Sequence, residues 1–444
     1  MYPSLALVRF QGRAALLLAV FSLGFVANPH LVAAPESSGD ELRLAIVLTR
    51  HGVRSPLLTN EQLAAFSAQA WPKWEVGTGI QTPRGNELMG LMGDYYRARF
   101  IHEGALTGDP SQDANRVFVR ADNDQRTIET GRILGKALQQ LGEPDVHPLP
   151  AGTADPLFRT FKAHVGHPDT ALAVSAVLGR MGGDARNLER AYARQFDELK
   201  GVLYGPNGNP GPDSPFNAPT VVAQGKKNYV VEITGPLTAA LSCTDALLLE
   251  YTDGKPASEV GWGRLDSKTL TDLLSLHELF FDLADRTFYP AQVYASNLAS
   301  HIVDTLEQAA TGEPVPGAFG TPEERVVLLV GHDSNIANIG GLFGLNWYIG
   351  GSQMNPTFPG GSLLFELWKR PGPQGTCYVQ VSYVAQTLDQ MRDVTPLTLE
   401  SPPVVAPVFV PGCSSSAPGY GAPLPAFVRQ ARKVIDPSFI VPEP

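Results

Sequence analysis

LRLAIVLTRHGVRSP, residues 42–56, joins a short run rich in branched aliphatic side chains to a basic turn that contains a glycine. An aliphatic run of this kind, without polar alternation, is typical of a strand buried on both faces of a sheet. The basic turn begins at Arg50, directly after the run, so it would lie at the carboxyl end of the strand. The segment predicts an α/β fold with polar residues at one edge of its sheet.

Two further aliphatic runs also end in polar turns. Val117–Arg120 precedes a polar turn at 122–124 and a helical pattern that continues through Leu141. Glu324–Val330 precedes the segment G-H-D-S-N at 331–335. In open α/β sheets, ligands bind where the loops at the carboxyl ends of several strands converge. We therefore expect the three polar turns to line one crevice.

The middle of the chain differs from its two ends. Residues 153–294 hold helical patterns and a loop rich in Gly, Pro and Asn, which predict a mainly α-helical insert (cap) domain. The flanking residues, 40–152 and 295–444, would form the α/β core domain. Outside the strands named above, we expect helices at 83–99, 184–203, 237–251 and 267–286 and an antiparallel hairpin at 363–368 and 378–384.

The composition of the 444-residue chain indicates a folded protein with a large core. Hydrophobic residues make up 43% of the chain and charged residues 18%, which excludes disorder as its main state. The net charge of −10 argues against a surface that binds nucleic acid by counterion release. The 44 glycines and 38 prolines, which follow no regular period, indicate many structured loops.

The N-terminal residues follow the order of a secretory signal. Arg9 and Arg13 precede an apolar run at 14–26, and small residues follow through Ala34. The apolar run is shorter than the ~18–20 residues that a membrane-spanning helix needs. We expect residues 1–34 to be a cleaved signal peptide, and the mature protein to be periplasmic or secreted and free of the membrane. A membrane anchor and a buried helix are the alternative interpretations.

Three cysteines would enter an oxidising compartment, an odd number that allows one internal disulfide at most. Cys377 and Cys413 lie in loop-rich sequence, whereas Cys243 lies in an apolar helical pattern. We therefore expect a disulfide between Cys377 and Cys413. No C-x-x-C spacing occurs, so neither a zinc site nor a redox motif is indicated.

The turn after the first strand has residues suited to phosphate chemistry. Arg50 and Arg54 flank His51 within five residues. Guanidinium groups grip phosphate oxygens in a bidentate way, and a neutral imidazole can attack phosphorus to form a phosphoramidate. A basic surface loop is the alternative interpretation of this turn.

The other two turns would complete such a site. Arg126 lies at the start of a helix, where the helix dipole also favours an anion, although it could instead pair with a nearby aspartate on the surface. His332 and Asp333 follow a buried strand, and a carboxylic acid there could protonate a leaving alkoxide. Clustered cations would stabilise the phosphoryl group without a metal. They would also lower the pKa of His51, while bound phosphate would raise that of Asp333.

These segments resemble the histidine acid phosphatases, in particular the bacterial phytase/acid phosphatase branch. The resemblance covers most of the chain and rests on R-H-G-V-R-S-P at 50–56, T-P-R-G at 82–85, D-Q-R-T at 124–127, G-H-D-S-N at 331–335 and Q-M-R at 390–392. It implies a phosphoglycerate-mutase-like α/β core sheet flanked by helices, with a mainly α-helical inserted domain.

The resemblance also implies roles for individual residues. His51 would be the nucleophile and Asp333 the general acid of a two-step mechanism that needs no metal or other cofactor. The phosphate would be held by Arg50, Arg54, Arg126 and His332. The partner would be a small phosphomonoester rather than a nucleic acid.

The chain departs from the enteric phytases of this branch in two ways. Those relatives carry Thr-Lys directly after the motif's proline to hold extra substrate phosphates, whereas this chain has Leu57 and Leu58. They also have several disulfides, which three cysteines cannot reproduce. Arg264 is a weaker candidate for a contact to a distal group of the substrate. Asp245 could face the pocket, the alternative being an ordinary acid in the first turn of a helix.

The expected function is that of an exported acid phosphatase acting on sugar phosphates and inositol phosphates. A specific 4-phytase, a glucose-1-phosphatase and a phosphotransferase or mutase are alternatives of the same kind. A protein that only binds a phospholigand is an alternative of another class, although such a protein needs no proton donor at Asp333. The sequence has no phosphate-binding P-loop, no H-E-x-x-H and no G-x-S-x-G.

Overall fold

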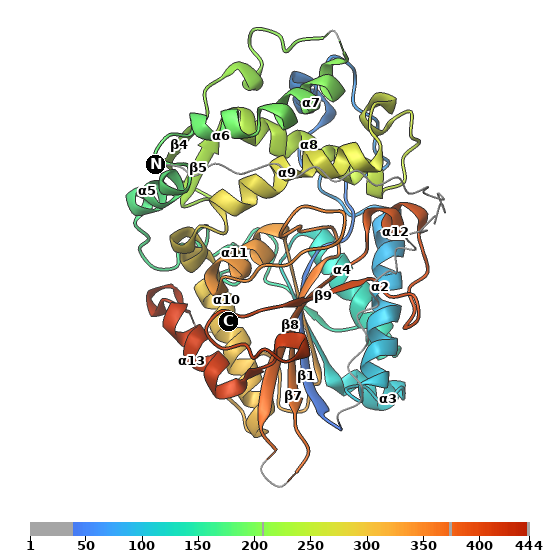
Figure 1. Cartoon of the computed structure of the whole chain (residues 1–444). Helices are drawn as coiled ribbons and strands as arrows, with labels where there is room; N and C mark the ends of the chain where they lie inside the picture. The colour runs from blue at the N-terminus through green and yellow to red at the C-terminus, as the bar shows by residue number, and fades with distance from the viewer. Residues whose placement is uncertain (1–38, 207, 373–374, 442–444) are drawn as a thin grey trace, which may run out of the picture. The chain divides into compact units, whose positions relative to one another are not determined.

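A mixed β-sheet lies at the centre of the chain (Figure 1). The computed structural model describes residues 39–206, 208–372 and 375–441, so the expected signal peptide at 1–34 lies outside the described residues. The eight strands lie in the order β10-β8-β7-β1-β6-β2-β3, with β9 paired to β8. Their bounds are β1 (Glu41–Arg50), β2 (Val117–Ala121), β3 (Val146–His147), β6 (Val326–Gly331), β7 (Ser362–Lys369), β8 (Cys377–Ala385), β9 (Val404–Val408) and β10 (Ala422–Pro423).

The three strands that carry the polar turns are parallel neighbours, as expected. β6 lies between β1 and β2, with Arg50 opposite Gly331 and Ala121 opposite Val330. Because the three strands end at the same level, the turns that follow them meet at one edge of the sheet. The hairpin expected in the C-terminal part is also confirmed, since β7 and β8 pair in antiparallel orientation.

Helices cover both faces of the sheet because side chains along each strand alternate between two hydrophobic clusters. In β1, Ile46 and Leu48 belong to one cluster and Ala45 and Val47 to the other. In Figure 1, α2 and α4 lie on one side of the sheet and α10 and α13 on the other. The bounds of these and the remaining core helices are α1 (Asn60–Leu63), α2 (Pro83–His102), α3 (Pro110–Asp113), α4 (Gln125–Gln139), α10 (Phe288–Thr311), α11 (Asp333–Phe343), α12 (Leu388–Asp393) and α13 (Leu424–Val434).

The segment expected to form the insert is mainly helical but also holds a small two-stranded sheet. Its elements are α5 (Thr170–Arg180), α6 (Arg186–Ala191), α7 (Ala193–Tyr204), β4 (Val221–Gln224), β5 (Val231–Thr234), α8 (Pro236–Thr252) and α9 (Ser267–Ala284). The helix expected at 184–203 is divided at Tyr192, whose backbone leaves the helical region. The boundary expected at residue 294 falls inside the continuous helix α10. The division into a core and an insert stays a prediction.

The expected disulfide does not form, because Cys243, Cys377 and Cys413 are all free thiols. Cys377 opens β8 and pairs across the hairpin with Lys369. The ladder between β8 and β9 ends at Val408, before Cys413, so no pairing holds the two cysteines together.

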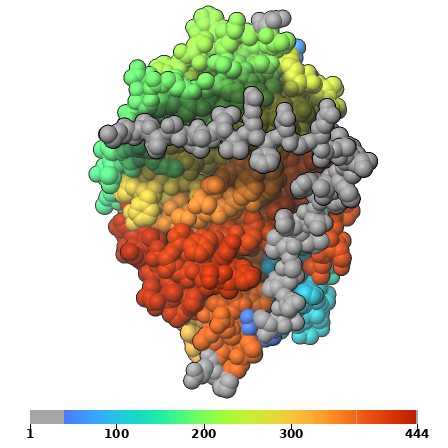
Figure 2. Space-filling view, in the orientation of Figure 1, coloured from blue at the N-terminus to red at the C-terminus, as the bar shows by residue number. Residues whose placement is uncertain are grey.

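Figure 2 shows the C-terminal residues, coloured red, spread over the face that contains α13.

Among the described residues, no helix is both long and apolar enough to cross a membrane.

A buried acid in α8 makes the stability of the fold depend on pH. Glu250 is buried, and its Oε2 accepts a hydrogen bond from the Gly261 backbone N–H at 3.3 Å, while its Oε1 has no partner among the described residues. Burial raises the pKa of Glu250 from 4.5 to about 8. Between these values the folded chain keeps a proton that the unfolded chain has lost. The free energy of unfolding therefore falls as the pH rises through this window.

We expect Glu250→Gln to remove this dependence, because an amide is close in shape to the protonated acid and does not ionise. Relative to the wild type, the variant should gain up to about 1.4 kcal/mol in free energy of unfolding for each pH unit between 5 and 8. Urea unfolding at several pH values measures the difference. Glu313→Gln, which changes an exposed acid that is not among the groups acting on Glu250, should leave a flat difference. A flat difference for Glu250→Gln as well would show that Glu250 ionises normally in the folded chain.

Candidate active site

A cavity of about 570 Å³ lies at the carboxyl edge of the parallel strands. Residues from the turns after β1 and β6 and from the start of α4 line it, together with residues of β5, α8 and α9. The structure thus brings all three polar turns together, as the strand order predicts. The lining of the cavity includes eight of the predicted site residues: His51, Arg54, Leu57, Leu58, Arg126, Asp245, His332 and Asp333.

The imidazole of His51 is held in one tautomer. Its Nδ1 lies 2.9 Å from the Gly52 carbonyl oxygen, which can only accept, so Nδ1 carries a hydrogen and donates it. The lone pair then resides on Nε2. Burial, and next the charges of Arg126, Arg54 and Arg50, hold the pKa of His51 well below its ordinary value of 6.5. His51 is therefore a neutral base with one free nitrogen at the cavity.

Arg54 and Arg126 bring positive charge to the cavity, and each is paired with an aspartate. Arg54 Nη2 lies 3.2 Å from Asp245 Oδ2, and Arg126 Nη2 lies 2.5 Å from Asp124 Oδ2. Burial, and next the like charge of Arg54, lower the pKa of Arg126 to about 10. Because the charge of Arg54 disfavours that of Arg126, an anion bound between them would relieve the repulsion.

Arg50 lies behind the wall of the cavity. It is fully buried and is absent from the lining. Its Nη1 donates to the Thr357 carbonyl at 2.6 Å, and its Nη2 lies 3.1 Å from both Asp245 Oδ1 and Asp333 Oδ2. The structure therefore does not place Arg50 where the sequence places it, among the groups that touch phosphate. It lies instead beneath two cavity carboxylates.

Asp333 begins α11 and is ionised in this setting. Its Oδ1 accepts a hydrogen bond from the Ser334 backbone N–H at 2.8 Å, and Oδ2 pairs with Arg50. Burial raises the pKa of Asp333, but the charges of Arg50 and Arg54 outweigh it and hold the pKa at about 2. A proton must therefore be delivered to Asp333 before it can act as an acid.

His332 is oriented by an aspartate from the second polar turn. Its Nε2 lies 2.7 Å from Asp122 Oδ2, and Arg159 Nη2 lies 3.1 Å from the same nitrogen. Arg159 also pairs with Asp122 at 2.7 Å and with Asp124. Burial is the largest effect on the pKa of His332 and lowers it, against the opposing influence of Asp122.

Several residues of the site carried no signal that sequence reasoning used. Arg159, His277 and Asp285 line the cavity. Arg159 and Asp285 belong to no motif, and His277 stood out only because its surroundings fail to match a zinc-protease pattern. Asp245 proves more central than expected, since one carboxylate bridges Arg50 and Arg54.

Arg264 is the predicted pocket residue that the structure places elsewhere. Its guanidinium donates to the Val202 carbonyl and, at 3.0 Å, to Gln69 Oε1. It also lies over the ring of Trp262, with 5.6 Å from Cζ to the ring centroid. These contacts fix a loop, and Arg264 does not line the cavity.

In the described part of the chain, two groups of side chains have ligand atoms close enough to approach a metal ion. One is formed by Asp122, Asp124 and His332 and the other by Asp245, His277 and Asp333. The carboxylates of both groups already pair with arginines. Guanidinium groups therefore supply the positive charge that these carboxylates would otherwise seek from a metal.

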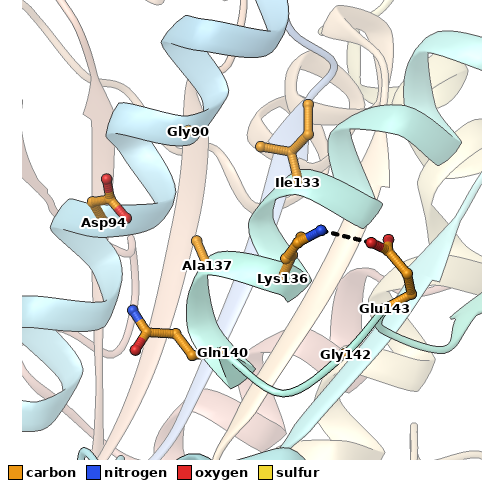
Figure 3. A pocket seen from close by; sticks show the side chains of 8 residues that line it. All are labelled: Gly90, Asp94, Ile133, Lys136, Ala137, Gln140, Gly142 and Glu143. Atoms are coloured by element: carbon orange, nitrogen blue, oxygen red, sulfur yellow. Dashed lines mark hydrogen bonds and ion pairs between the residues drawn. The ribbon is translucent and has the colours of Figure 1, made fainter.

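A second hollow, of about 500 Å³, lies between α2 and α4 (Figure 3). The ion pair of Lys136 Nζ with Glu143 Oε1, 2.6 Å long, crosses one side of it. None of the three polar turns reaches this hollow. Its lining consists of Gly90, Asp94, Ile133, Lys136, Ala137, Gln140, Gly142 and Glu143.

Comparisons with known proteins agree with this geometry. The family model of the histidine phosphatase superfamily (branch 2) matches residues 41–384. Phytase AppA of Escherichia coli (strain K12) is 34% identical over 90% of this chain and 93% of its own length. Glucose-1-phosphatase of Providencia rettgeri is 26% identical over 88% of this chain and 92% of its own length. Hafnia alvei phytase in complex with myo-inositol hexakis sulphate superposes with a TM-score of 0.82 at 32% identity, covering 92% of this chain and 100% of that chain.

The matched range begins at the first residue of β1 and ends within β8, so it includes all three polar turns. The similarity to solved structures extends over the mixed sheet and the helices on both of its faces. The chain belongs to branch 2 of the histidine phosphatase superfamily and is a histidine acid phosphatase that hydrolyses phosphomonoesters.

Proposed function

We propose that this phosphatase cleaves sugar phosphates and inositol phosphates through a phosphohistidine on His51, with Asp333 as the proton donor. One observation carries the proposal. His51 is a neutral imidazole whose Nδ1 is held by Gly52 and whose Nε2 is free, in a cavity that Arg54 and Arg126 also line. That combination supplies a nucleophile and a place for the phosphate it attacks.

In the first step, Nε2 of His51 attacks phosphorus and the bond from phosphorus to the ester oxygen breaks. Arg54, Arg126 and His332 would hold the phosphate oxygens and stabilise the charge spread over them. Because Arg50 is buried behind the wall, we propose that it acts through Asp245 and Asp333 instead of touching phosphate. Arg159 would add charge near His332.

The leaving oxygen needs a proton, which Asp333 must first receive. At acid pH a phosphomonoester carries one proton on its phosphate, because its second pKa is about 6. Transfer of this proton to Asp333 leaves a dianionic phosphoryl group between the arginines and a carboxylic acid beside the leaving oxygen. In the second step, Asp333 takes a proton from water while the oxygen of that water displaces His51 from phosphorus.

The pH profile tests this proposal. Activity needs neutral His51, and the lowered pKa keeps it neutral until well below pH 6.5. It also needs the protonated phosphate, which is lost above about pH 6. We therefore expect kcat/KM to peak below about pH 6 in assays of phosphate release, and to survive a strong chelator. A neutral or alkaline optimum that the chelator abolishes would point to a metal-dependent phosphatase instead.

The residues that line the cavity indicate how strongly the enzyme would prefer phytate over simple monoesters. The two curated relatives are named as a phytase and a glucose-1-phosphatase, and the Hafnia alvei enzyme was solved with a hexakis sulphate. Here Leu57 and Leu58 line the cavity and offer no charge to additional phosphates, and Glu232 adds negative charge. Arg159 and Lys162 also line the cavity and add positive charge besides that of Arg54 and Arg126. The absence of charge at Leu57 and Leu58 supports a broad monoesterase over a specific phytase.

Leu58→Lys should raise kcat/KM for phytate more than for a small sugar phosphate. A charge-assisted contact contributes about 1.5–3 kcal/mol, or roughly 10- to 150-fold in affinity. The gain should shrink at high salt, because salt screens exposed charges. Leu58→Gln, which adds polarity without charge, is the matched control. If the wild type already prefers phytate strongly and the lysine adds nothing, other cations bind the additional phosphates of phytate.

Two further expectations belong to the proposal. The order of charged, apolar and small residues at 1–34 supports export to the periplasm or the medium. The concentration of helices α5–α9 between β3 and α10 supports an inserted cap, one wall of the cavity being formed by α8 and α9. Detection of mature protein lacking these N-terminal residues, by mass spectrometry of the secreted fraction, tests export.

A further inference from the structure

Asp285 and Asn338 are two of the polar side chains that line the cavity with hydrogen-bonding atoms left unpaired. Asp285, which follows α9, is 9% exposed, and its carboxylate has neither a hydrogen bond nor an ion pair within the part of the chain that the structure describes. Asn338 in α11 is 4% exposed, and its buried Oδ1 has no partner there either. Buried polar groups are nearly always paired, because leaving one unpaired destabilises the fold. Both side chains thus have hydrogen-bonding capacity left for something in the cavity.

The two side chains come from elements that are packed together beside the proton donor. A Cβ added at Gly341 of α11 would meet the Cα of Arg286, the residue after Asp285, at 2.5 Å. Asp333 begins the same helix α11, and its charge is felt by Asp285. Because Asp333 serves the leaving oxygen, groups near it face the alcohol of the substrate more than its phosphate.

The chemistry of this wall suits hydroxyl groups. Burial, and next the charge of Asp333, hold the pKa of Asp285 well above its ordinary value. A neutral carboxylic acid both donates and accepts hydrogen bonds, and a carboxamide does the same. An additional phosphate would find no cation in such a pair, and an ammonium group would find no counter-charge. An alcohol hydroxyl can satisfy either group.

We infer that Asp285 and Asn338 form a hydroxyl-binding subsite that selects phosphomonoesters of polyols. The inference rests on the proposed function, since the subsite acts on the alcohol that His51 displaces. A site that hydrogen-bonds a substrate hydroxyl rejects the analogue without it, because its own buried polar groups are then left unpaired. The apolar part of the cavity wall, by contrast, would accept an unsubstituted ring equally well.

myo-Inositol monophosphate and cyclohexyl phosphate test the subsite, because the two share a six-carbon ring and differ in its hydroxyls. We compare the ratio of their kcat/KM values between the wild type and each variant, which cancels intrinsic differences between the leaving groups. Asp285→Ala and Asn338→Leu should each lower the ratio by roughly five- to tenfold in favour of cyclohexyl phosphate. Asp285→Asn, which can still pair with a hydroxyl, should retain more of the ratio.

Asp282→Asn is the matched control, because Asp282 lies at the end of α9, three residues before Asp285, but pairs with Arg180 and Arg286. Its ratio should equal that of the wild type. An unchanged ratio in both Asp285→Ala and Asn338→Leu would overturn the subsite, even if both substrates were hydrolysed more slowly. Since these two residues lie on different elements, one variant that fails to fold leaves the other as the test. A wild type that hydrolyses neither substrate would refute the proposed function itself.

Discussion

His51→Ala is expected to lower turnover by roughly 10⁴-fold or more, since the residual rate must come from water attacking the bound phosphate. The arginines that line the cavity do not depend on His51 for their positions. Arg54 is held by Asp245 and Arg126 by Asp124. Inorganic phosphate should therefore still bind to the variant, which titration calorimetry can measure. Loss of turnover with binding retained is the signature of a missing nucleophile.

The covalent intermediate gives a direct second readout. Wild-type enzyme mixed with substrate carrying labelled phosphate and denatured at alkaline pH should retain label on a histidine, and His51→Ala should retain none. His167→Ala is the matched control, because His167 is exposed on the loop before α5. It should behave like the wild type in both experiments. Near-normal turnover in His51→Ala would remove His51 from the mechanism.

The parts of the fold that could be predicted are those that depend on residues close together in the sequence. β1, β2 and β6 are continuous aliphatic runs, and each is followed at once by a polar turn. Alignment of their carboxyl ends follows from a general rule for parallel sheets, so the meeting of the three turns could be expected without a structure. Five of the cavity residues could be predicted in this way: His51, Arg54, Arg126, His332 and Asp333.

The parts that could not be predicted depend on contacts between distant segments. Helix α10 was not predicted from the sequence, because buried polar residues, including Asn297 and His301, interrupt its apolar pattern. The cavity wall that contains Arg159 and Asp285 is assembled only when α9 and the loop before α5 pack onto the sheet edge. Arg50 shows the complementary limit. Its place in the motif suggests a phosphate contact, but two carboxylates from α8 and α11 hold it inside.

Asp333→Asn is expected to cost an amount that depends on the leaving group. An alkoxide leaves only with a proton, whereas p-nitrophenolate is stable enough to leave without one. We expect the phosphorylation step to slow by roughly 10²–10⁴-fold with sugar phosphates and far less with p-nitrophenyl phosphate. Single-turnover measurements of alcohol or phenol release isolate this step from the later hydrolysis.

The pKa of Asp333 makes the comparison informative. Arg50 and Arg54 hold the pKa of Asp333 at about 2, so the carboxylate is deprotonated before the substrate binds. It must then receive a proton from the phosphate of the substrate. The amide that Asp333→Asn introduces could neither receive nor pass on that proton. For sugar phosphates the wild-type rate should fall as the pH rises past about 6, while the slow variant should lose most of this dependence.

Asp245→Asn separates proton transfer from the loss of charge beside Arg50. Asp245 and Asp333 lie equally far from Arg50 Nη2, at 3.1 Å, so either change removes one of its two carboxylate partners. Only the loss of Asp333 removes the acid, so Asp245→Asn should slow both substrates by similar factors. If Asp333→Asn also slows both substrates equally, its role is to position the phosphate or Arg50, and another group protonates the leaving oxygen.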